Sequence, residues 1–200
     1  MSVVEQGDYR ALIFDLDETL ARVEIPWAEW NRWLVEDFPD DDLKPLFRDA
    51  FARERYVPGT VLNQQLARID MAEFTKRATE YEVEHYIGYT PNELLASLVP
   101  RLKRVGVQFY LWTNNTRPTA ERILEEMGIA GHFEGLVTRT EVEYTKPSPD
   151  GWRHIHDDMR PLSEYLFVGD GENDRLVAEA IGIDFFYIDH FRNGPGALTS

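Results

Sequence analysis

The sequence has no cysteine, which excludes disulfide bonds, thiolate metal sites and a cysteine nucleophile. Basic residues are also few, because 21 Lys and Arg stand against 36 Asp and Glu, giving a formal net charge of −15. A surface of that sign repels phosphate backbones, so we expect no nucleic-acid partner. An anionic substrate would have to bind at a locally positive site.

Long apolar segments are missing as well. No run approaches the roughly 18 residues that a membrane-spanning helix needs, and residues 1–8 lack the basic and apolar regions of a secretion signal. We therefore expect a soluble, cytoplasmic protein with no membrane partner, and the oligomeric state stays open. With 13 glycines, 11 prolines and 43% hydrophobic residues, collagen-like and disordered chains are excluded. The length fits one domain, or one domain that carries a smaller insert.

Short apolar runs alternate with helical patterns along most of the chain. We predict strands at 9–14, 107–112, 135–138, 165–168 and 184–188. Apolar residues spaced three and four apart predict helices that end at Gly128 and Gly182, and Thr90–Glu93 is typical of a capping box that opens a helix to about residue 104. Strands that alternate with helices predict an α/β fold, a parallel sheet covered by helices on both faces.

The stretch from about residue 22 to 88 breaks this alternation. It is polar and aromatic, and it shows helical patterns at 27–37, 43–55, 61–67 and 71–84. We therefore expect a helical insert at 22–88 and a core domain formed by 1–21 and 89–200. Trp27, Trp30 and Trp33 recur at every third position, which favours a packing surface over an aromatic wall for a ligand.

Two carboxylates follow the first predicted strand. Side chains alternate along an extended chain, so Asp15 and Asp17 are expected on the same side. Ligands of parallel sheets bind beyond the carboxyl ends of the strands, where these two residues would lie. Two such charges about 4 Å apart cost about 4 kcal/mol at an effective dielectric of 20, so a cation must offset them or one pKa must rise. The plainer interpretation is an acidic turn that caps a helix.

Three further strand ends carry polar groups. Thr113 and Asn114 follow one strand, Lys146 precedes a predicted helix, and Asp170 and Asp174 surround a tight turn after another strand. Taken singly, each has an ordinary explanation: a helix cap, a solvated lysine and turn chemistry. All of them would meet at one edge of one sheet, so independent explanations become improbable.

These residues resemble the four motifs of the haloacid dehalogenase-like hydrolase superfamily, in order. The motifs are Asp15-Leu16-Asp17-Glu18-Thr19, Thr113, Lys146 and Gly169-Asp170-x-x-x-Asp174. The resemblance covers roughly residues 8–20 and 89–190, and the insert is similar to the helical cap of many members. It implies a Rossmann-like sheet, Mg²⁺ as cofactor and an aspartyl-phosphate intermediate.

The resemblance also implies individual roles. Asp15 would attack phosphorus, and Asp17 would protonate the leaving alcohol and then activate water. Asp15, the backbone carbonyl of Asp17 and Asp170 would hold Mg²⁺, with Asp174 acting on it indirectly or through water. Thr113, the amide of Asn114 and Lys146 would bind the phosphoryl oxygens.

The sequence thus predicts a magnesium-dependent phosphatase for a small phosphorylated metabolite. An acid at position 17 argues against a dehalogenase, because a halide leaving group needs no proton. A phosphomutase of the same superfamily remains open, as do a phospho-accepting signalling module and a binding protein on an inactive hydrolase fold. The cap lysines Lys44 and Lys76 lie among charged residues, which disfavours a phosphonate-cleaving enzyme with a Schiff-base lysine.

Overall fold

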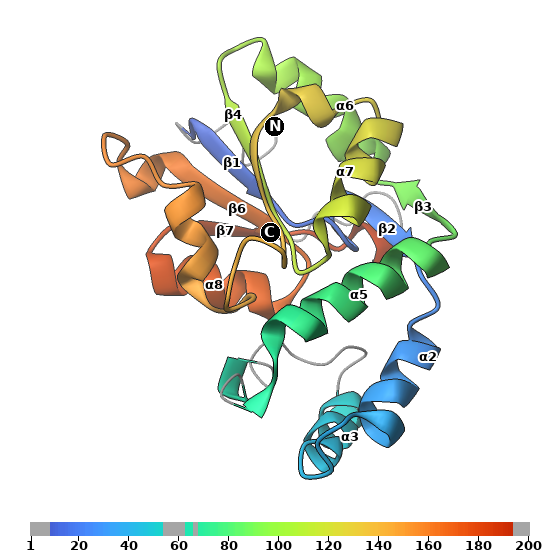
Figure 1. Ribbon diagram of the computed structural model, residues 1–200. Coiled ribbons are helices and arrows are strands. Elements are labelled where there is room, and N and C mark those ends of the chain that lie inside the picture. The colour runs from blue at the N-terminus through green and yellow to red at the C-terminus, as the bar shows by residue number, and fades with distance from the viewer. Residues whose placement is uncertain (1–8, 54–62, 66–67, 194–200) are drawn as a thin grey trace.

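A five-stranded parallel sheet forms the centre of the computed structural model, which describes residues 9–53, 63–65 and 68–193 (Figure 1). Its order is β5-β4-β1-β6-β7, and every neighbouring pair is parallel. The strands are β1 (Ala11–Phe14), β4 (Gln108–Trp112), β5 (Phe133–Val137), β6 (Tyr165–Gly169) and β7 (Asp184–Tyr187). Each lies within two residues of its predicted range.

Helices cover both faces of this sheet. Leu12 and Phe14 of β1 pack on the face covered by α6 (Glu93–Lys103) and α7 (Arg117–Glu126). Ala11 and Ile13 point to the opposite face, which α8 (Glu172–Ile181) covers (Figure 1). Four short elements complete the core: η3 (Ala130–His132), η4 (Pro149–His154), η5 (Leu162–Glu164) and α9 (His190–Asn193). The alternation of apolar side chains between two covered faces confirms the predicted α/β class.

One predicted helix start is wrong by two residues. The capping residue of α6 is Asn92, whose side-chain oxygen accepts from the backbone N–H of Leu95. Thr90 and Pro91 belong instead to a strand, β3 (Gly88–Pro91). The reason is a non-local pairing, because β3 runs antiparallel to β2 (Ala21–Glu24) and places Thr90 opposite Arg22.

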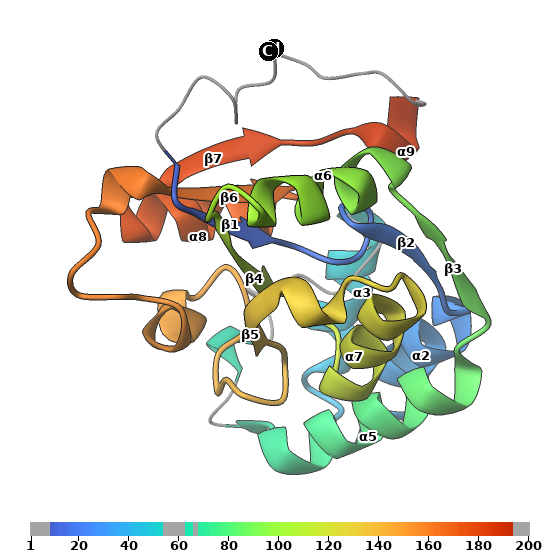
Figure 2. The ribbon, with the colours of Figure 1, turned by 90° about the horizontal axis from the view of Figure 1, so that it is seen from above.

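The chain enters the insert through β2 and returns to the core through β3, so the β2–β3 ribbon connects the two parts (Figure 2). Sequence patterns did not predict either strand, since each has only four residues and the partners are more than 60 positions apart. The domain boundaries expected near residues 21 and 88 fall within this ribbon.

The insert is a helical cap with its own apolar core. It contains α2 (Trp27–Arg32), the π-helical turn η1 (Trp33–Asp37), α3 (Lys44–Arg53) and α5 (Met71–His85). Trp30, Phe47 and Phe74 are buried together there, and Trp33 packs against them, so these tryptophans line the interior of the cap. Trp27 stacks on Tyr81. Most of the helix predicted at 61–67 lies outside the described residues.

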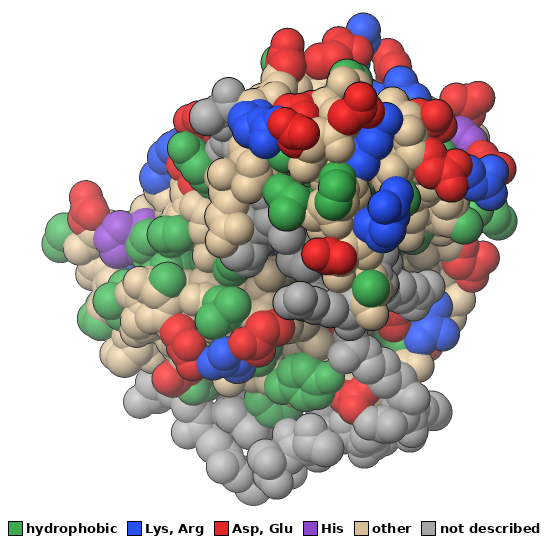
Figure 3. Space-filling view, turned by 90° about the horizontal axis from the view of Figure 1, so that it is seen from below, with side chains coloured by type: hydrophobic (Ala, Val, Ile, Leu, Met, Phe, Trp, Pro, Cys, Tyr) green, Lys and Arg blue, Asp and Glu red, His purple; other side chains and the backbone are tan. Residues whose placement is uncertain are grey.

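Two observations concern the molecule's exterior. Acidic and basic side chains are intermixed on the face that Figure 3 shows. Among the described residues, no helix combines the length and the apolar character that crossing a bilayer requires.

Candidate active site

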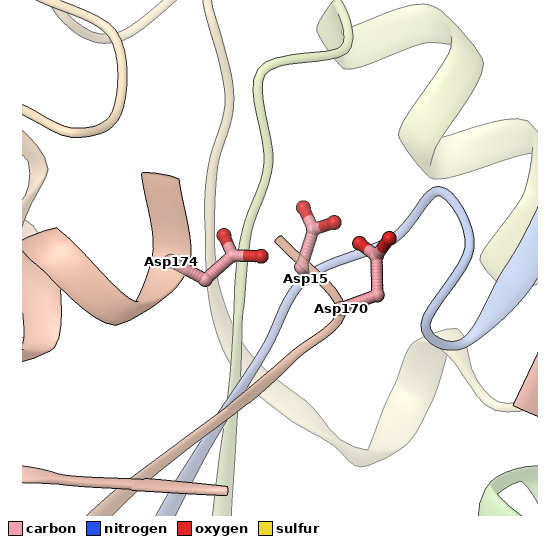
Figure 4. A group of neighbouring side chains, drawn as sticks. All are labelled: Asp15, Asp170 and Asp174. Carbon is pink, nitrogen blue, oxygen red and sulfur yellow. The ribbon is translucent and has the colours of Figure 1, made fainter. Parts of the chain in front are cut away.

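Three carboxylates converge at the carboxyl edge of the sheet. Asp15 follows β1, Asp170 follows the neighbouring strand β6, and Asp174 lies in the first turn of α8. One oxygen from each lies within 4.8 Å of the others, and Figure 4 shows the three side chains clustered beyond the strand ends. All three residues are at most 9% exposed. Adjacent parallel strands end at the same edge of the sheet, so Asp15 and Asp170, which are far apart in the sequence, become neighbours here.

Glycine at position 169 permits this close approach. A Cβ added there would lie 2.7 Å from the Cβ of Asp174, closer than real carbon atoms pack. The backbone N–H of Gly171 also donates to Asp174 Oδ2 at 3.2 Å. The turn between β6 and α8 therefore brings the Asp174 carboxylate back over the end of β6.

Lys146 lies between two of these acids. Its Nζ donates to Asp15 Oδ1 at 2.7 Å and also contacts Asp174 Oδ1, and the residue is only 2% exposed. Burial alone would lower the pKa of this ammonium, but the carboxylates of Asp15 and Asp174 raise it by more, so Lys146 is charged. Burial raises the pKa of Asp174 to about 6, although Lys146 opposes that rise.

The residues present fit a divalent cation. Three buried carboxylates lie together here, and like charges held this close in a protein interior need compensating positive charge. The donors are carboxylate oxygens, the ligands that Mg²⁺ prefers. A small, doubly charged, oxygen-seeking ion matches both properties.

Thr113 and Asn114 lie at the end of β4, beside this cluster. Thr113 Oγ1 donates to Asn115 Oδ1 at 3.0 Å and accepts from the Asn115 backbone N–H at 3.1 Å. The Asn114 side chain binds the backbone of Lys146 twice, donating to its carbonyl at 3.2 Å and accepting from its N–H at 3.0 Å. The sequence predicted that the Asn114 amide binds the phosphoryl group, and it did not predict this use of the side chain on the Lys146 backbone.

Asp17 has a different placement. The chain leaves the extended conformation after Asp15, and Glu18 has a positive φ of 61°, so strand alternation does not extend to position 17. Asp17 Oδ1 accepts from the backbone N–H of Val23 in β2 at 2.9 Å. Its carboxylate therefore lies outside the group of three and is attached to the ribbon that leads into the cap.

Two cap residues that the sequence analysis did not select reach the core beside this site. Glu82 of α5 is buried and accepts from the backbone N–H and hydroxyl of Thr116, at 3.0 and 2.7 Å. Asn63 bonds to the backbone of Thr145, the residue before Lys146. No local pattern could reveal these contacts, because their partners lie 34 and 82 positions away.

The parallel five-stranded core, with acids at its carboxyl edge and a helical insert, has the predicted Rossmann-like architecture. The model of one family, haloacid dehalogenase-like hydrolase, matches residues 9–182. The chain belongs to this family, so the predicted family is confirmed.

Named relatives have different activities. The chain is 28% identical to the tyrosine-protein kinase PtkA of Mycobacterium tuberculosis over 190 residues, covering 86% of this chain but only 60% of PtkA's length. It is 30% identical to the phosphoglycolate phosphatase of Rhodospirillum rubrum over 194 residues, covering 87% of this chain and 77% of that enzyme. The structure of Bacillus subtilis YfnB bound to magnesium shares the fold at a TM-score of 0.54 and 17% identity, covering 94% of this chain and 90% of YfnB.

Proposed function

We propose that the protein is a magnesium-dependent phosphatase that hydrolyses a small phosphorylated metabolite through an aspartyl-phosphate. The observation that carries this proposal is the buried contact of Lys146 with Asp15 and Asp174, beside Asp170. Carboxylates beside an ammonium would suit both a cation and a phosphate, and the similarity to the phosphoglycolate phosphatase of Rhodospirillum rubrum supports the reaction class. In this proposal the catalytic core comprises 1–21 and 89–200, and the cap comprises 22–88. A cytoplasmic location stays a prediction.

The reaction would proceed in two displacements at phosphorus. Lys146 bonds to one oxygen of Asp15, and the second oxygen is the nucleophile. This oxygen forms a bond to phosphorus while the bond between phosphorus and the oxygen of the leaving alcohol breaks. Asp17 protonates the oxygen of the leaving alcohol. Asp17 then takes a proton from water, which attacks phosphorus and releases phosphate and Asp15.

The remaining site residues would neutralise and orient the phosphoryl group. Asp15, the Asp17 backbone carbonyl and Asp170 would hold Mg²⁺, with Asp174 acting through water and through Lys146. When bound, the cation supplies positive charge to the phosphoryl oxygens. Thr113, the Asn114 backbone amide and Lys146 would bind those oxygens from the protein side.

The first prediction concerns the nucleophile. Asp15→Asn should reduce phosphate release by at least about 10³-fold, because an amide cannot form the acyl-phosphate. Release is measured over sugar phosphates, nucleotides, phosphoglycolate and phosphoamino acids, with and without Mg²⁺. Asp158→Asn, at a side chain that is 96% exposed, is the matched control and should keep full activity.

Each outcome of this screen separates the candidate functions. Retention of more than a few per cent of activity in Asp15→Asn would contradict the assigned nucleophile. Isomerised product without free phosphate would indicate a phosphomutase. A single slow phosphorylation without turnover would indicate a phospho-accepting module.

A further inference from the structure

The peptide backbone that carries Lys146 is held on two sides by asparagine side chains. Asn63 of the cap donates from Nδ2 to the Thr145 carbonyl at 2.8 Å and accepts from the Thr145 N–H at 3.1 Å. Asn114 of the core makes the same pair of bonds to Lys146. Each side-chain amide thus pairs with a residue's N–H and C=O as a neighbouring strand would.

The two asparagines bind successive residues from different parts of the molecule. Asn63 of the cap holds Thr145, and Asn114 of the core holds Lys146. The two residues begin a turn in which the Ser148 N–H also donates to the Thr145 carbonyl at 2.9 Å. Removing Asn63 therefore leaves the Thr145 N–H without its side-chain acceptor and the Thr145 carbonyl with one donor fewer.

We propose that Asn63 is a positioning residue for Lys146. It touches no reacting atom, and it acts by fixing the peptide from which the Lys146 side chain reaches Asp15 and Asp174. Because Asn63 belongs to the cap, Lys146 is fully held only while the cap is docked on the core. Cap docking would then complete the electrostatic site as well as cover it.

A second contact supports this coupling. Glu82, also in the cap, binds the N–H and hydroxyl of Thr116, three residues after Thr113. The cap thus contacts both core segments that would bind the phosphoryl group, the one after β4 and the one before Lys146. Of the two contacts, that of Asn63 lies closer along the chain to a charged group of the site.

The test measures the accessibility of Lys146 and the reaction rate separately. Trace acetylation with acetic anhydride, followed by mass spectrometry, compares Lys146 with Lys44, Lys76 and Lys103 in the same 200-residue protein. In Asn63→Ala we expect Lys146 to react about fivefold faster or more, because local opening exposes a side chain that is now 3% exposed. The kcat for p-nitrophenyl phosphate should fall about tenfold with little change in KM.

Gln64→Ala is the matched control, since this exposed neighbour lies on the same cap segment. It should change neither lysine reactivity nor kcat. Circular dichroism verifies folding, and if Asn63→Ala does not fold, Asn63→Asp serves in its place because it keeps the acceptor for the Thr145 N–H and loses the donor.

The catalytic part of this inference rests on the proposed function, and the two measurements can fail separately. Unchanged Lys146 acetylation in Asn63→Ala overturns the positioning role whether or not the enzyme is active. Faster acetylation with unchanged kcat also overturns it, because Lys146 would then be released without consequence. A wild-type protein that releases no phosphate contradicts the proposed function, and the acetylation comparison still decides whether Asn63 holds Lys146.

Discussion

At the scale of single residues, the position of Asp174 in the site depends on Gly169, which has no side chain. Gly169 is the last residue of β6, and Asp174 folds back over it. Any Cβ at 169 would meet the Cβ, Cγ and Oδ2 atoms of Asp174, so glycine is required here for space. The backbone of α8 is fixed by its packing on β6 and β7, which leaves Asp174 little room to retreat.

Gly169→Ala should therefore displace Asp174 and weaken cation binding. We expect the Mg²⁺ concentration for half-maximal phosphate release to rise about tenfold or more, with a loss of about 1–3 kcal/mol in the free energy of unfolding from overpacking. Mg²⁺ titration of activity and urea unfolding measure the two effects. Gly131→Ala is the control, because its added Cβ would meet no described atom within 4 Å. Equal Mg²⁺ requirements in both variants would refute the argument.

The sequence predicted the charged residues of the site, but it did not predict the hydrogen bonds that hold the backbone of those residues in place. Asp15, Asp170, Asp174 and Lys146 stand out because each follows a strand or precedes a helix in an α/β pattern, and the structure brings them together. The supporting contact of Asn63 could not be predicted, because it pairs residues 82 positions apart through a backbone that any amino acid offers.

At the scale of secondary structure, Asn92 joins three elements. Its side-chain oxygen caps α6, its amide donates to the Thr19 carbonyl at 3.0 Å, and its backbone N–H donates to the Leu20 carbonyl at 2.8 Å. The residue is fully buried. One asparagine thus connects a helix start, the end of β3 and the loop after Asp17.

Asn92→Ala should lower the free energy of unfolding by about 2–4 kcal/mol. The loss combines a helix cap, worth about 1 kcal/mol, with a buried Thr19 carbonyl left without its donor, which costs about 1–3 kcal/mol. Urea unfolding measures it. Asp70→Ala removes the exposed cap of α5 and should cost only about 1 kcal/mol. If both variants lost the same stability, the buried bond to Thr19 would contribute nothing.

Element prediction succeeded where the signal was local and failed where it was not. The helices α7 and α8 follow from apolar residues three and four apart, with Gly128 and Gly182 at positive φ after their ends. Strands β2 and β3 have no such signal. Thr90 and Pro91 fit a helix start equally well until Arg22 and Ala21 are known to lie opposite them.

At the scale of the whole molecule, the cap and core share a buried carboxylate. Glu82 is 2% exposed and receives hydrogen bonds from Thr116, with Arg139 nearby. Burial raises its pKa above the ordinary value of 4.5, although Thr116, Thr119 and Arg139 oppose the rise. The folded protein therefore binds this proton more tightly than the unfolded chain does, and the resulting stability is lost as pH rises through the folded pKa.

Glu82→Gln should remove this pH dependence. Its stability relative to the wild type should increase as pH rises above about 4.5, because the wild type must then hold a buried charge. Urea unfolding at several pH values measures the difference. Glu80→Gln, at an exposed position on the same helix, should show a difference that is flat with pH. A flat profile for Glu82→Gln would contradict the raised pKa.

The β2–β3 ribbon has a consequence for the family's history. Glu24 and Gly88 are paired across it, and the Ile87 N–H donates to the Glu24 carbonyl at 2.9 Å, so the two points where the cap is attached are adjacent in space. Paired residues of antiparallel strands lie about 5 Å apart, a gap that a two-residue turn can close. An ancestral hairpin could therefore have acquired the cap, or a descendant could lose it, in one insertion or deletion that leaves the register of every core strand unchanged.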